Sequence, residues 1–445
     1  MVRLRALSTS LPPPRTASDL EHRVEPGGTF RLSDSQEILK VEETKKKFLS
    51  YGRQHVSDED IEAVTRVLRS DWLTQGPAIA QFEDALAEKV GASHVVACAT
   101  GTAALHLAML GLRIGPGDKI LTTPNTFLAD ANCGRYVGAD VAFADIETDT
   151  GNIAPDAVAA ALEADIDRKI KAVIPVHFAG QPCDLPRIHE LATEHGAVVV
   201  DDGCHALGAS YSCDGKSILI GNASHSAMTV FSFHPVKHVA MGEGGAIATN
   251  DGDLAERVRT LRNHGMTKSD FTYSDQAASP EGDTNPWYYE MQHLGFNYRV
   301  TDIQAALGLS QLDRLRWSIE HRNRLADQYR TLIAGSLPSE TVKPLSVRPG
   351  VVHAYHLFVV LIDFNRLGVS RASVMKQLRE AGVGSQVHYI PVHLQPYYRQ
   401  HAGTAPGDFP NAERYYEQAL SLPMYPDLTA KDCGRVVDTL RACLT

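Results

Sequence analysis

Four segments of this 445-residue chain place chemically active side chains where a strand-like apolar run ends. In the first, TVFSFHPVKHVAMGEGGAIATN (229–250), Lys237 stands between two apolar runs and precedes a glycine-rich stretch. A lysine amine forms Schiff bases with carbonyl compounds, and glycines allow a backbone to approach a ligand closely. Taken alone, this segment leaves open that Lys237 is an ordinary solvent-facing loop lysine.

The second segment, VVVDDGCHALGASY, ends three valines with Asp201 and Asp202, and His205 follows three residues later. A carboxylate at the end of a buried strand needs a cationic or N–H partner, because burying it unpaired is costly. Such an acid pairs with a positively charged group of a ligand, or it caps the next helix. This segment alone does not decide between the two.

The third and fourth segments supply a helix start and an aromatic ring. In CATGTAALHLAML, Thr100, Gly101 and Thr102 open a helical pattern, whose free N–H groups and dipole suit a phosphate as well as ordinary capping. In TPNTFLADANCGRYVGAD, Phe127 follows a strand-like run, where it stacks on a flat ring or packs into the core.

Together the four segments supply what pyridoxal 5′-phosphate needs: a lysine for its aldehyde, an acid for its ring nitrogen, a helix start for its phosphate and an aromatic ring for its face. The sequence contains neither a G-x-x-x-x-G-K-[ST] loop nor a G-x-G-x-x-G turn between strand and helix, which disfavours P-loop and dinucleotide sites. His388 and His393 lack a clear third partner, so no metal is expected.

The elements that position these segments alternate between short apolar runs and helical patterns. This alternation predicts an α/β fold with a mainly parallel sheet in a large domain, covered by helices on both faces. Ligands of such sheets bind beyond the carboxyl ends of the strands. The predicted strands are HVVACA, KILTTP, DVAFAD, KAVIPVHF, AVVVDD, MTVFSF and GAIATN.

Changes of pattern along the chain predict three parts. Residues 1–47 are rich in Pro, Ser, Glu and Lys and are expected to form a flexible N-terminal arm. Residues 48–313 form the predicted large domain, which begins with a helix capped by Ser57. Residues 314–445 form a smaller α+β domain, with a long first helix and with strands HLFVVLID and SQVHYIP around the helix SRASVMKQLREAG.

Bulk properties exclude several classes of protein. A net charge of −10 argues against a nucleic-acid binder, and no apolar run is long enough for a membrane span. Seven scattered cysteines without a C-x-x-C pair favour reduced thiols. With no apolar segment of the secretory type at the start, a cytoplasmic protein is expected.

Ten motifs resemble those of the DegT/DnrJ/EryC1/StrS family of pyridoxal-phosphate-dependent sugar aminotransferases, which have the aspartate-aminotransferase (type I) fold. Among them are SDWLTQGPAIAQFE, ATGTAALH, DDGCHALGASY, LRNHGM and GFNYRVTDIQAALGLSQL. The resemblance runs from about Tyr51 to the C-terminus. Through SFHPVK, HALGASY and QVHYIPVH the chain is most similar to the pseudaminic acid branch, the UDP-4-amino-4,6-dideoxy-N-acetyl-β-L-altrosamine transaminases.

The resemblance implies a role for each matching residue. Lys237 corresponds to the Schiff-base lysine, Asp202 to the acid that pairs with the pyridine nitrogen, and His205 to a position near the cofactor's phenolic oxygen. Gly101, Thr102 and Ser232 match phosphate-binding positions, Phe127 matches the ring-stacking position, and Asn297 matches an asparagine that reaches the phosphate from a neighbouring subunit. The weaker candidates for sugar-nucleotide contacts are Tyr51, Thr74, Gln75, His388 and Tyr389.

The implied reaction moves the amino group of L-glutamate to C4 of a UDP-linked 4-keto-6-deoxy-N-acetylhexosamine, with pyridoxamine 5′-phosphate as the intermediate form of the cofactor and with active sites shared in a homodimer. Aminotransferases for bacillosamine-type, perosamine-type or antibiotic deoxysugar precursors are alternatives, as is a regulatory paralogue that binds the cofactor. The dehydratase branch of the family carries His in place of the lysine, so Lys237 argues against it. The segment His238–Met241 differs from the commoner Thr-containing sequence of relatives.

Overall fold

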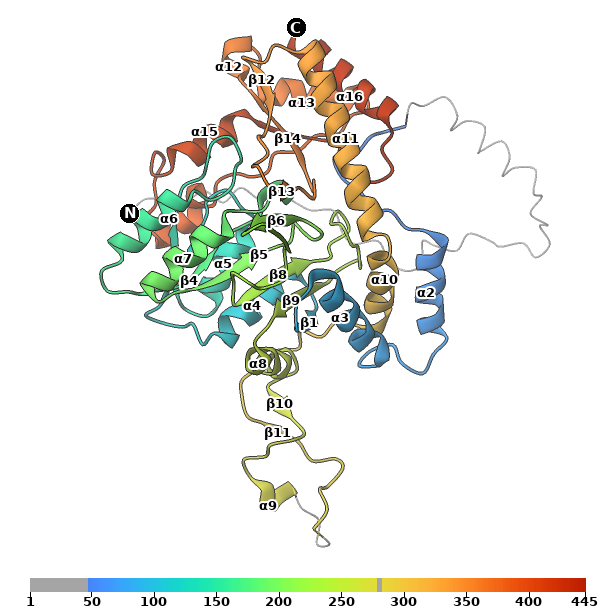
Figure 1. Ribbon diagram of the computed structural model, residues 1–445, viewed down its shortest axis with the longest axis vertical. Helices are drawn as coiled ribbons and strands as arrows, with labels where there is room; N and C mark the ends of the chain where they lie inside the picture. Colours follow the sequence, from blue (N-terminus) through green and yellow to red (C-terminus); the bar gives the residue numbers. More distant parts are fainter. Residues whose placement is uncertain (1–46, 278–281) are drawn as a thin grey trace, which may run out of the picture. The chain divides into compact units, whose positions relative to one another are not determined.

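The predicted apolar runs form a seven-stranded sheet, in the order β1-β9-β8-β5-β4-β2-β3 (Figure 1). Its strands are β1 (His94–Cys98), β2 (Lys119–Thr122), β3 (Asp140–Phe143), β4 (Ile170–Ile174), β5 (Val198–Asp202), β8 (Met228–Ser232) and β9 (Gly245–Thr249). Strands β3, β2, β4, β5 and β8 pair in parallel, and β9 lies antiparallel to both β8 and β1. The prediction of a mainly parallel sheet is confirmed.

Helices cover both faces of this sheet because successive strand residues point to opposite sides. In β1, Val95 and Ala97 pack on one face and Val96 and Cys98 on the other. The first face is covered by α3 (Pro77–Val90), α6 (Pro155–Ala164) and α7 (Leu185–His195), and the second by α4 (Gly101–Gly111), α5 (Leu128–Tyr136) and α8 (Gly252–Arg262). The helix α2 (Asp58–Leu68) packs against α10 (Asp302–Leu312), and Ser57 caps it as predicted.

The last third of the chain forms a second layered structure. Its antiparallel sheet, in the order β12-β14-β15, packs with α11, α13 and α16 around a core of its own. The elements here are α11 (Leu315–Ser336), β12 (Val342–Pro344), β13 (Val351–Val352), β14 (Phe358–Ile362), α12 (Phe364–Leu367), α13 (Arg371–Glu380), α14 (Pro396–His401), α15 (Pro410–Gln418), β15 (Ala419–Leu422) and α16 (Ala430–Leu444).

Two smaller sheets complete the fold. The strands β6 (Ser210–Cys213) and β7 (Lys216–Leu219) form a hairpin that β13 extends. The strands β10 (Met266–Thr267) and β11 (Glu290–Met291) form the base of a long excursion that carries the short helix α9 (Ser274–Ala277). Figure 1 shows the excursion between β10 and β11 extending beyond α8, away from the central sheet. We call this excursion, with its two strands, the projecting hairpin.

The structure is a computed structural model that describes residues 47–277 and 282–445. The predicted N-terminal arm therefore lies outside the described residues except for Lys47. Residues 48–445 form one compact unit, and the predicted division at residues 313 and 314 stays a prediction. Within the described part of the chain, no helix is both long and apolar enough to cross a membrane.

The predicted strand SQVHYIP is wrong. Only Gln386 pairs in this segment, through a single bridge to Ser421 in β15. Beyond it the backbone leaves the sheet, and the next side chain to meet β15 is His388, whose Nδ1 lies 2.8 Å from the Ser421 hydroxyl. Since Pro391 follows and has no N–H to donate, the segment does not extend the sheet further.

Candidate active site

One cavity of about 430 Å³ lies where the carboxyl ends of β1, β2, β5 and β8 meet, as expected for a sheet of this kind. Because β9 is antiparallel to both of its neighbours, β1 runs in the same direction as β8 and ends at the same edge. The predicted site residues that line the cavity are Tyr51, Gly101, Thr102, Phe127, Asp202, His205, Ser232, Lys237, His388 and Tyr389.

The start of α4 forms one corner of the cavity. The Thr100 hydroxyl accepts a hydrogen bond from the Ala103 N–H at 3.0 Å. The N–H groups of Gly101 and Thr102 have no backbone partner among the described residues. A Cβ on Gly101 would lie 2.8 Å from the Ser232 Cβ. A helix start and a hydroxyl therefore converge here, and this is a suitable cradle for a phosphate.

Lys237 follows β8 and reaches the same cavity. Its amine has no hydrogen bond or ion pair with the described residues. Burial lowers the pKa of Lys237, and the acidic groups around it, Asp202 among them, oppose that shift in part. Partial removal from water thus favours the neutral amine, which is the form that attacks a carbonyl carbon.

Asp202 is the last residue of β5 and is 6% exposed. Its Oδ1 accepts the Cys204 N–H at 2.7 Å, so the turn after the strand holds the carboxylate. The neighbouring Asp201 points elsewhere in the core, where Oδ2 lies 3.0 Å from His177 Nε2 and Oδ1 accepts the Thr229 hydroxyl at 2.8 Å. Because adjacent strand residues face opposite sides, only Asp202 reaches the cavity.

His205 is buried in the wall of the cavity, with Nε2 3.2 Å from the Tyr389 hydroxyl. Burial and the charge of Lys237 lower the pKa of His205 well below its usual value, so the ring is neutral at pH 7. Its Nδ1 is buried and has no hydrogen-bond partner among the described residues. The His356 ring lies against it at 4.3 Å between centroids.

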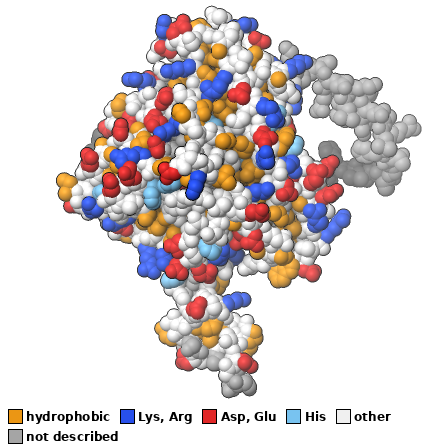
Figure 2. All heavy atoms as spheres, in the orientation of Figure 1, with side chains coloured by type: hydrophobic (Ala, Val, Ile, Leu, Met, Phe, Trp, Pro, Cys, Tyr) orange, Lys and Arg blue, Asp and Glu red, His pale blue; other side chains and the backbone are white. Residues whose placement is uncertain are grey.

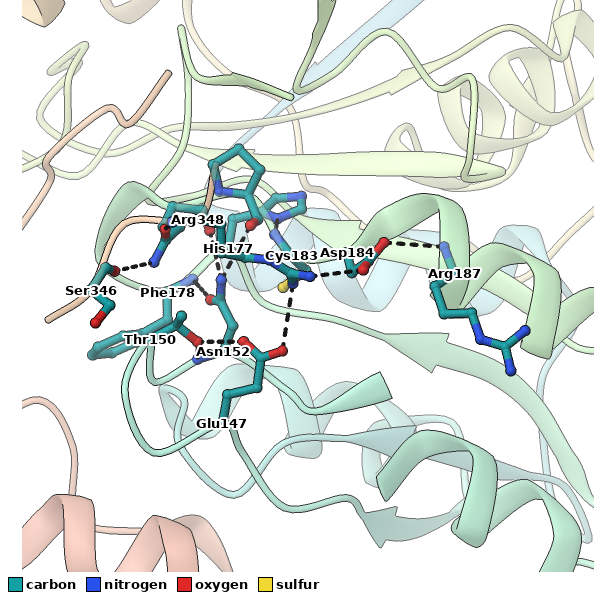
Figure 3. Close-up of polar contacts among 12 residues, drawn as sticks. Glu147, Thr150, Asn152, His177, Phe178, Cys183, Asp184, Arg187, Ser346 and Arg348 are labelled. Atoms are coloured by element: carbon teal, nitrogen blue, oxygen red, sulfur yellow. Dashed lines mark hydrogen bonds and ion pairs between the residues drawn. The ribbon is translucent and has the colours of Figure 1, made fainter. Parts of the chain in front are cut away.

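A polar network surrounds Phe178 and Arg348 (Figure 3). Phe178, whose ring centroid is 6.2 Å from that of His205, donates its N–H to Asn152 Oδ1 at 2.8 Å. Arg348 pairs with Asp184 at 2.7 Å and with Glu147 at 3.7 Å. These contacts join the loop after β4 to the segment before β13, and they fix the backbone on which Phe178 stands.

Three predicted residues lie outside the cavity. Thr74 and Gln75 are exposed, and Gln75 lines a separate hollow beside Arg259 and Arg299. Asn297 is exposed at the base of the projecting hairpin, where it pairs with Asn263. The predicted contact of Asn297 with the phosphate of another subunit stays a prediction.

The cavity also contains residues that the sequence did not single out. Asp130 stands in the first turn of α5, three positions after Phe127, and His356 precedes β14. Asp130 stands three positions after Phe127, one turn into α5, and therefore on the same side of the helix as that residue. This spacing was the only feature of the local sequence that pointed to a place of Asp130 near the cavity. His356 had no comparable signal, because its place beside His205 depends on how distant segments pack.

The described residues fit pyridoxal 5′-phosphate. Within one cavity they offer an unpaired amine, a fixed carboxylate, a helix start with two free N–H groups beside a hydroxyl, and the exposed ring of Phe127. The buried, unpartnered Nδ1 of His205 is a further polar group without a protein partner. Each group suits a different part of the cofactor.

Comparisons with known proteins agree with this arrangement. The sequence profile of the DegT/DnrJ/EryC1/StrS aminotransferase family matches residues 54–441. Spore coat polysaccharide biosynthesis protein SpsC of Bacillus subtilis (strain 168) is 40% identical over 399 residues, which cover 89% of this chain and 97% of SpsC.

Two solved structures are similar along nearly their whole length. Helicobacter pylori PseC, an aminotransferase involved in the biosynthesis of pseudoaminic acid, aligns with a TM-score of 0.78 and 30% identity, over 89% of this chain and 99% of PseC. Spr1654 of Streptococcus pneumoniae, solved in PLP and PMP forms, aligns with a TM-score of 0.77 and 27% identity, over 89% of this chain and 98% of Spr1654.

Proposed function

Since this chain belongs to the DegT/DnrJ/EryC1/StrS aminotransferase family, we propose that it moves the amino group of L-glutamate to C4 of a UDP-linked 4-keto-6-deoxy-N-acetylhexosamine. The coarser activity follows from the family: the chain is a pyridoxal-5′-phosphate-dependent sugar aminotransferase. The observation that carries the site assignment is the meeting of Lys237, Asp202 and the start of α4 in one cavity.

In this proposal each part of the cavity holds one part of the cofactor. The N–H groups of Gly101 and Thr102 and the hydroxyl of Ser232 would bind the phosphate, and Phe127 would cover the ring. Asp202 would accept a hydrogen bond from the protonated ring nitrogen. His205, neutral through burial, donates to the ring's phenolic oxygen.

When bound, the cofactor supplies an electron sink for the negative charge that develops on the carbon that loses a proton. The protein's part is proton transfer and orientation. The Lys237 amine, with its pKa lowered by burial, takes the proton from the α-carbon of the donor and returns a proton to C4 of the sugar. The Cys204 N–H holds the Asp202 carboxylate in place, where it would face the ring nitrogen.

Similarity to PseC along 99% of that protein supports a sugar of the pseudaminic acid type. The 40% identity to SpsC favours a second candidate, an aminotransferase for another nucleotide-linked keto-sugar. Both candidates use the same cofactor residues, so the difference must lie in the residues that contact the sugar. Tyr51, His388 and Tyr389 line the cavity and are the contacts that we assign to the sugar nucleotide.

We further propose a homodimer in which the projecting hairpin of one subunit reaches the partner. Three of the large apolar side chains of the hairpin are strongly exposed: Trp287 at 74%, Met291 at 63% and Leu294 at 80%. Figure 2 shows hydrophobic side chains on the surface of this projection. Exposed apolar side chains on a projection are typical of an interface, and Asn297 stands at its base.

The test of the sugar is a coupled assay with L-glutamate and two UDP-4-keto sugars of opposite C5 configuration, followed by mass spectrometry of the amino product. We expect turnover of the ketone of the pseudaminic acid pathway, whose C5 configuration is the opposite of gluco. Turnover of only the gluco-configured ketone would overturn this assignment and leave the second candidate. Lys237→Ala is the matched control and should give no amino sugar from either ketone.

A further inference from the structure

A second carboxyl group, that of Asp130, stands beside Asp202 in the cavity. Asp130 is 1% exposed, and its Oδ2 accepts the Thr126 hydroxyl at 2.5 Å. Its Oδ1 is buried and has no hydrogen-bond partner among the described residues. A buried carboxyl oxygen without a donor is costly when ionised, and the cost falls when that oxygen carries a proton.

The charges around Asp130 also favour its neutral form. Burial and then the charge of Asp202 raise the pKa of Asp130 well above its usual value; Thr126 and Lys237 act in the opposite direction but do not offset the shift. Two carboxylates that share a dry site do not both ionise. The titratable groups that face Asp130 are Asp202 on β5, Lys237 after β8, Cys204 in the turn after β5, Cys133 on α5 and Tyr389.

We propose that Asp130 is a positioning residue, protonated in the working enzyme, that donates a hydrogen bond to Asp202 and so keeps the negative charge on Asp202. The proposal rests on the proposed role of Asp202 toward the cofactor's ring nitrogen. A neutral donor stabilises Asp202 as an anion, so the proton between the ring nitrogen and Asp202 stays on the nitrogen. Asp130 itself touches neither substrate in this scheme.

Two substitutions separate this role from simple packing. Asp130→Asn keeps an oxygen for the Thr126 hydroxyl and an N–H for Asp202, but it does not titrate. Asp130→Ala removes both contacts. We expect kcat of the Asn variant to stay within about threefold of wild type, and kcat of the Ala variant to fall on the order of tenfold with KM for both substrates unchanged.

Infrared spectroscopy of the full chain, with and without cofactor, reads the protonation state directly. At about pH 7, wild type should show the carbonyl stretch of a protonated carboxylic acid, and Asp130→Asn should lack that band. The Ala variant should lack it as well. If the spectra of wild type and Asp130→Asn show the same acid bands, Asp130 is ionised in wild type. This result would overturn the proposal.

Thermal unfolding of the cofactor-free chain gives a second readout. The pKa of Asp130 is about 3.9 when unfolded and higher when folded, so its stabilising contribution is full below pH 4 and is lost as pH rises through the folded pKa. The melting temperature of Asp130→Asn should therefore rise relative to that of wild type as pH rises from about 5 to about 9. A gap that stays constant over this range contradicts the proposal.

The link to Asp202 has a readout of its own, the pH dependence of the bound cofactor's visible absorbance. Asp130→Ala should shift this titration, and Asp130→Asn should restore it. If Ala leaves the titration unchanged, the hydrogen bond to Asp202 is refuted even when the acid band is present. None of these spectroscopic readouts requires a sugar substrate, so failure of the proposed sugar assignment leaves them intact and is recognised separately.

Discussion

The Nε2 atom of His205 lies 3.2 Å from the hydroxyl of Tyr389, although the two residues are 184 positions apart. His205 follows β5 of the central sheet, and Tyr389 belongs to the segment that leaves β15 after a single bridge. Their rings stack at 6.2 Å with an interplanar angle of 22°. This contact joins two residues of the cavity wall: His205, which we assign to the cofactor, and Tyr389, which we assign to the sugar nucleotide.

The contact predicts different effects for the two partners. Tyr389→Phe leaves His205 in place and removes one hydrogen bond, so we expect a loss of activity of at most about tenfold. His205→Ala should cost more than His205→Gln, because glutamine retains an N–H donor for the cofactor's oxygen. Steady-state kinetics with L-glutamate measures all three variants. Equal losses in His205→Ala and His205→Gln would contradict a hydrogen-bonding role for His205.

Lys237→Ala should lower turnover by at least about a thousandfold, because it removes both the nucleophile and the proton-transfer group. The cofactor should still bind, held at the phosphate corner and by Asp202. Borohydride treatment followed by peptide mass spectrometry should locate the cofactor on Lys237 in wild type and on no residue in the variant. Lys237→Arg keeps the positive charge as a control and should be equally inactive. Covalent capture that persists in either variant would refute the assignment.

Asp202→Asn and Asp201→Asn form a matched pair of neighbouring acids with different surroundings. Asp202→Asn should keep the fold and lose most activity, since a neutral amide does not hold a proton on the ring nitrogen. Asp201 is buried against His177 and Thr229, so Asp201→Asn should cost about 1–3 kcal/mol of unfolding free energy with smaller effects on turnover. Denaturant unfolding and kinetics on both variants compare these losses. If Asp201→Asn instead lost activity and Asp202→Asn instead lost stability, the assignment of Asp202 to the cofactor would be wrong.

The sequence predicted much of the sheet and of the cofactor site for the same reason. Buried strands are short apolar runs, and polar residues at the end of such a run or a few residues after it lie near the edge where ligands bind. Asp202 and Lys237 satisfy this rule. The antiparallel direction of β9 was open to the same reasoning, because residues 233–244 between β8 and β9 contain no helix that a parallel crossover needs.

Other features depend on packing that local patterns encode weakly or not at all. An acid in the first turn of a helix, such as Asp130, usually only complements the helix dipole, and its place beside Asp202 follows from how α5 sits on the sheet. The segment SQVHYIP alternates as a strand does, yet only Gln386 pairs with β15. Its remaining residues turn toward the cavity, where His388 and Tyr389 lie.

Buried histidines should make the enzyme sensitive to acid, and His353 tests this. Its Nδ1 accepts the Tyr355 N–H at 2.9 Å, and burial lowers the pKa of His353 to about 3. Its contribution to stability is therefore full above about pH 6.5 and is lost as pH falls toward 3, by up to about 1.4 kcal/mol per pH unit.

His353→Asn keeps an acceptor for the Tyr355 N–H and does not titrate. Denaturant unfolding at about pH 7 and about pH 4.5 should show a smaller acid loss in this variant than in wild type, by roughly 2–3 kcal/mol. His293→Asn, at an exposed position, is the control and should follow wild type. An acid loss in His353→Asn as large as that of wild type would contradict the buried neutral state of His353.

A mixed dimer tests whether Asn297 serves the neighbouring active site. Asn297 lies outside the cavity of its own subunit, so Asn297→Ala should weaken cofactor binding only if the residue reaches the partner's phosphate corner. We expect a loss on the order of tenfold in cofactor affinity, as for one hydrogen bond to a charged group.

In a mixture of Lys237→Ala and Asn297→Ala chains, each mixed dimer then contains one intact site and one doubly altered site. At limiting cofactor, co-expression with two purification tags should yield mixed dimers with about half the wild-type activity, while each parent variant alone stays low. Activity in the mixed dimers no higher than the mean of the two parents, or a wild-type enzyme that light scattering shows to be monomeric, would rule out the shared site.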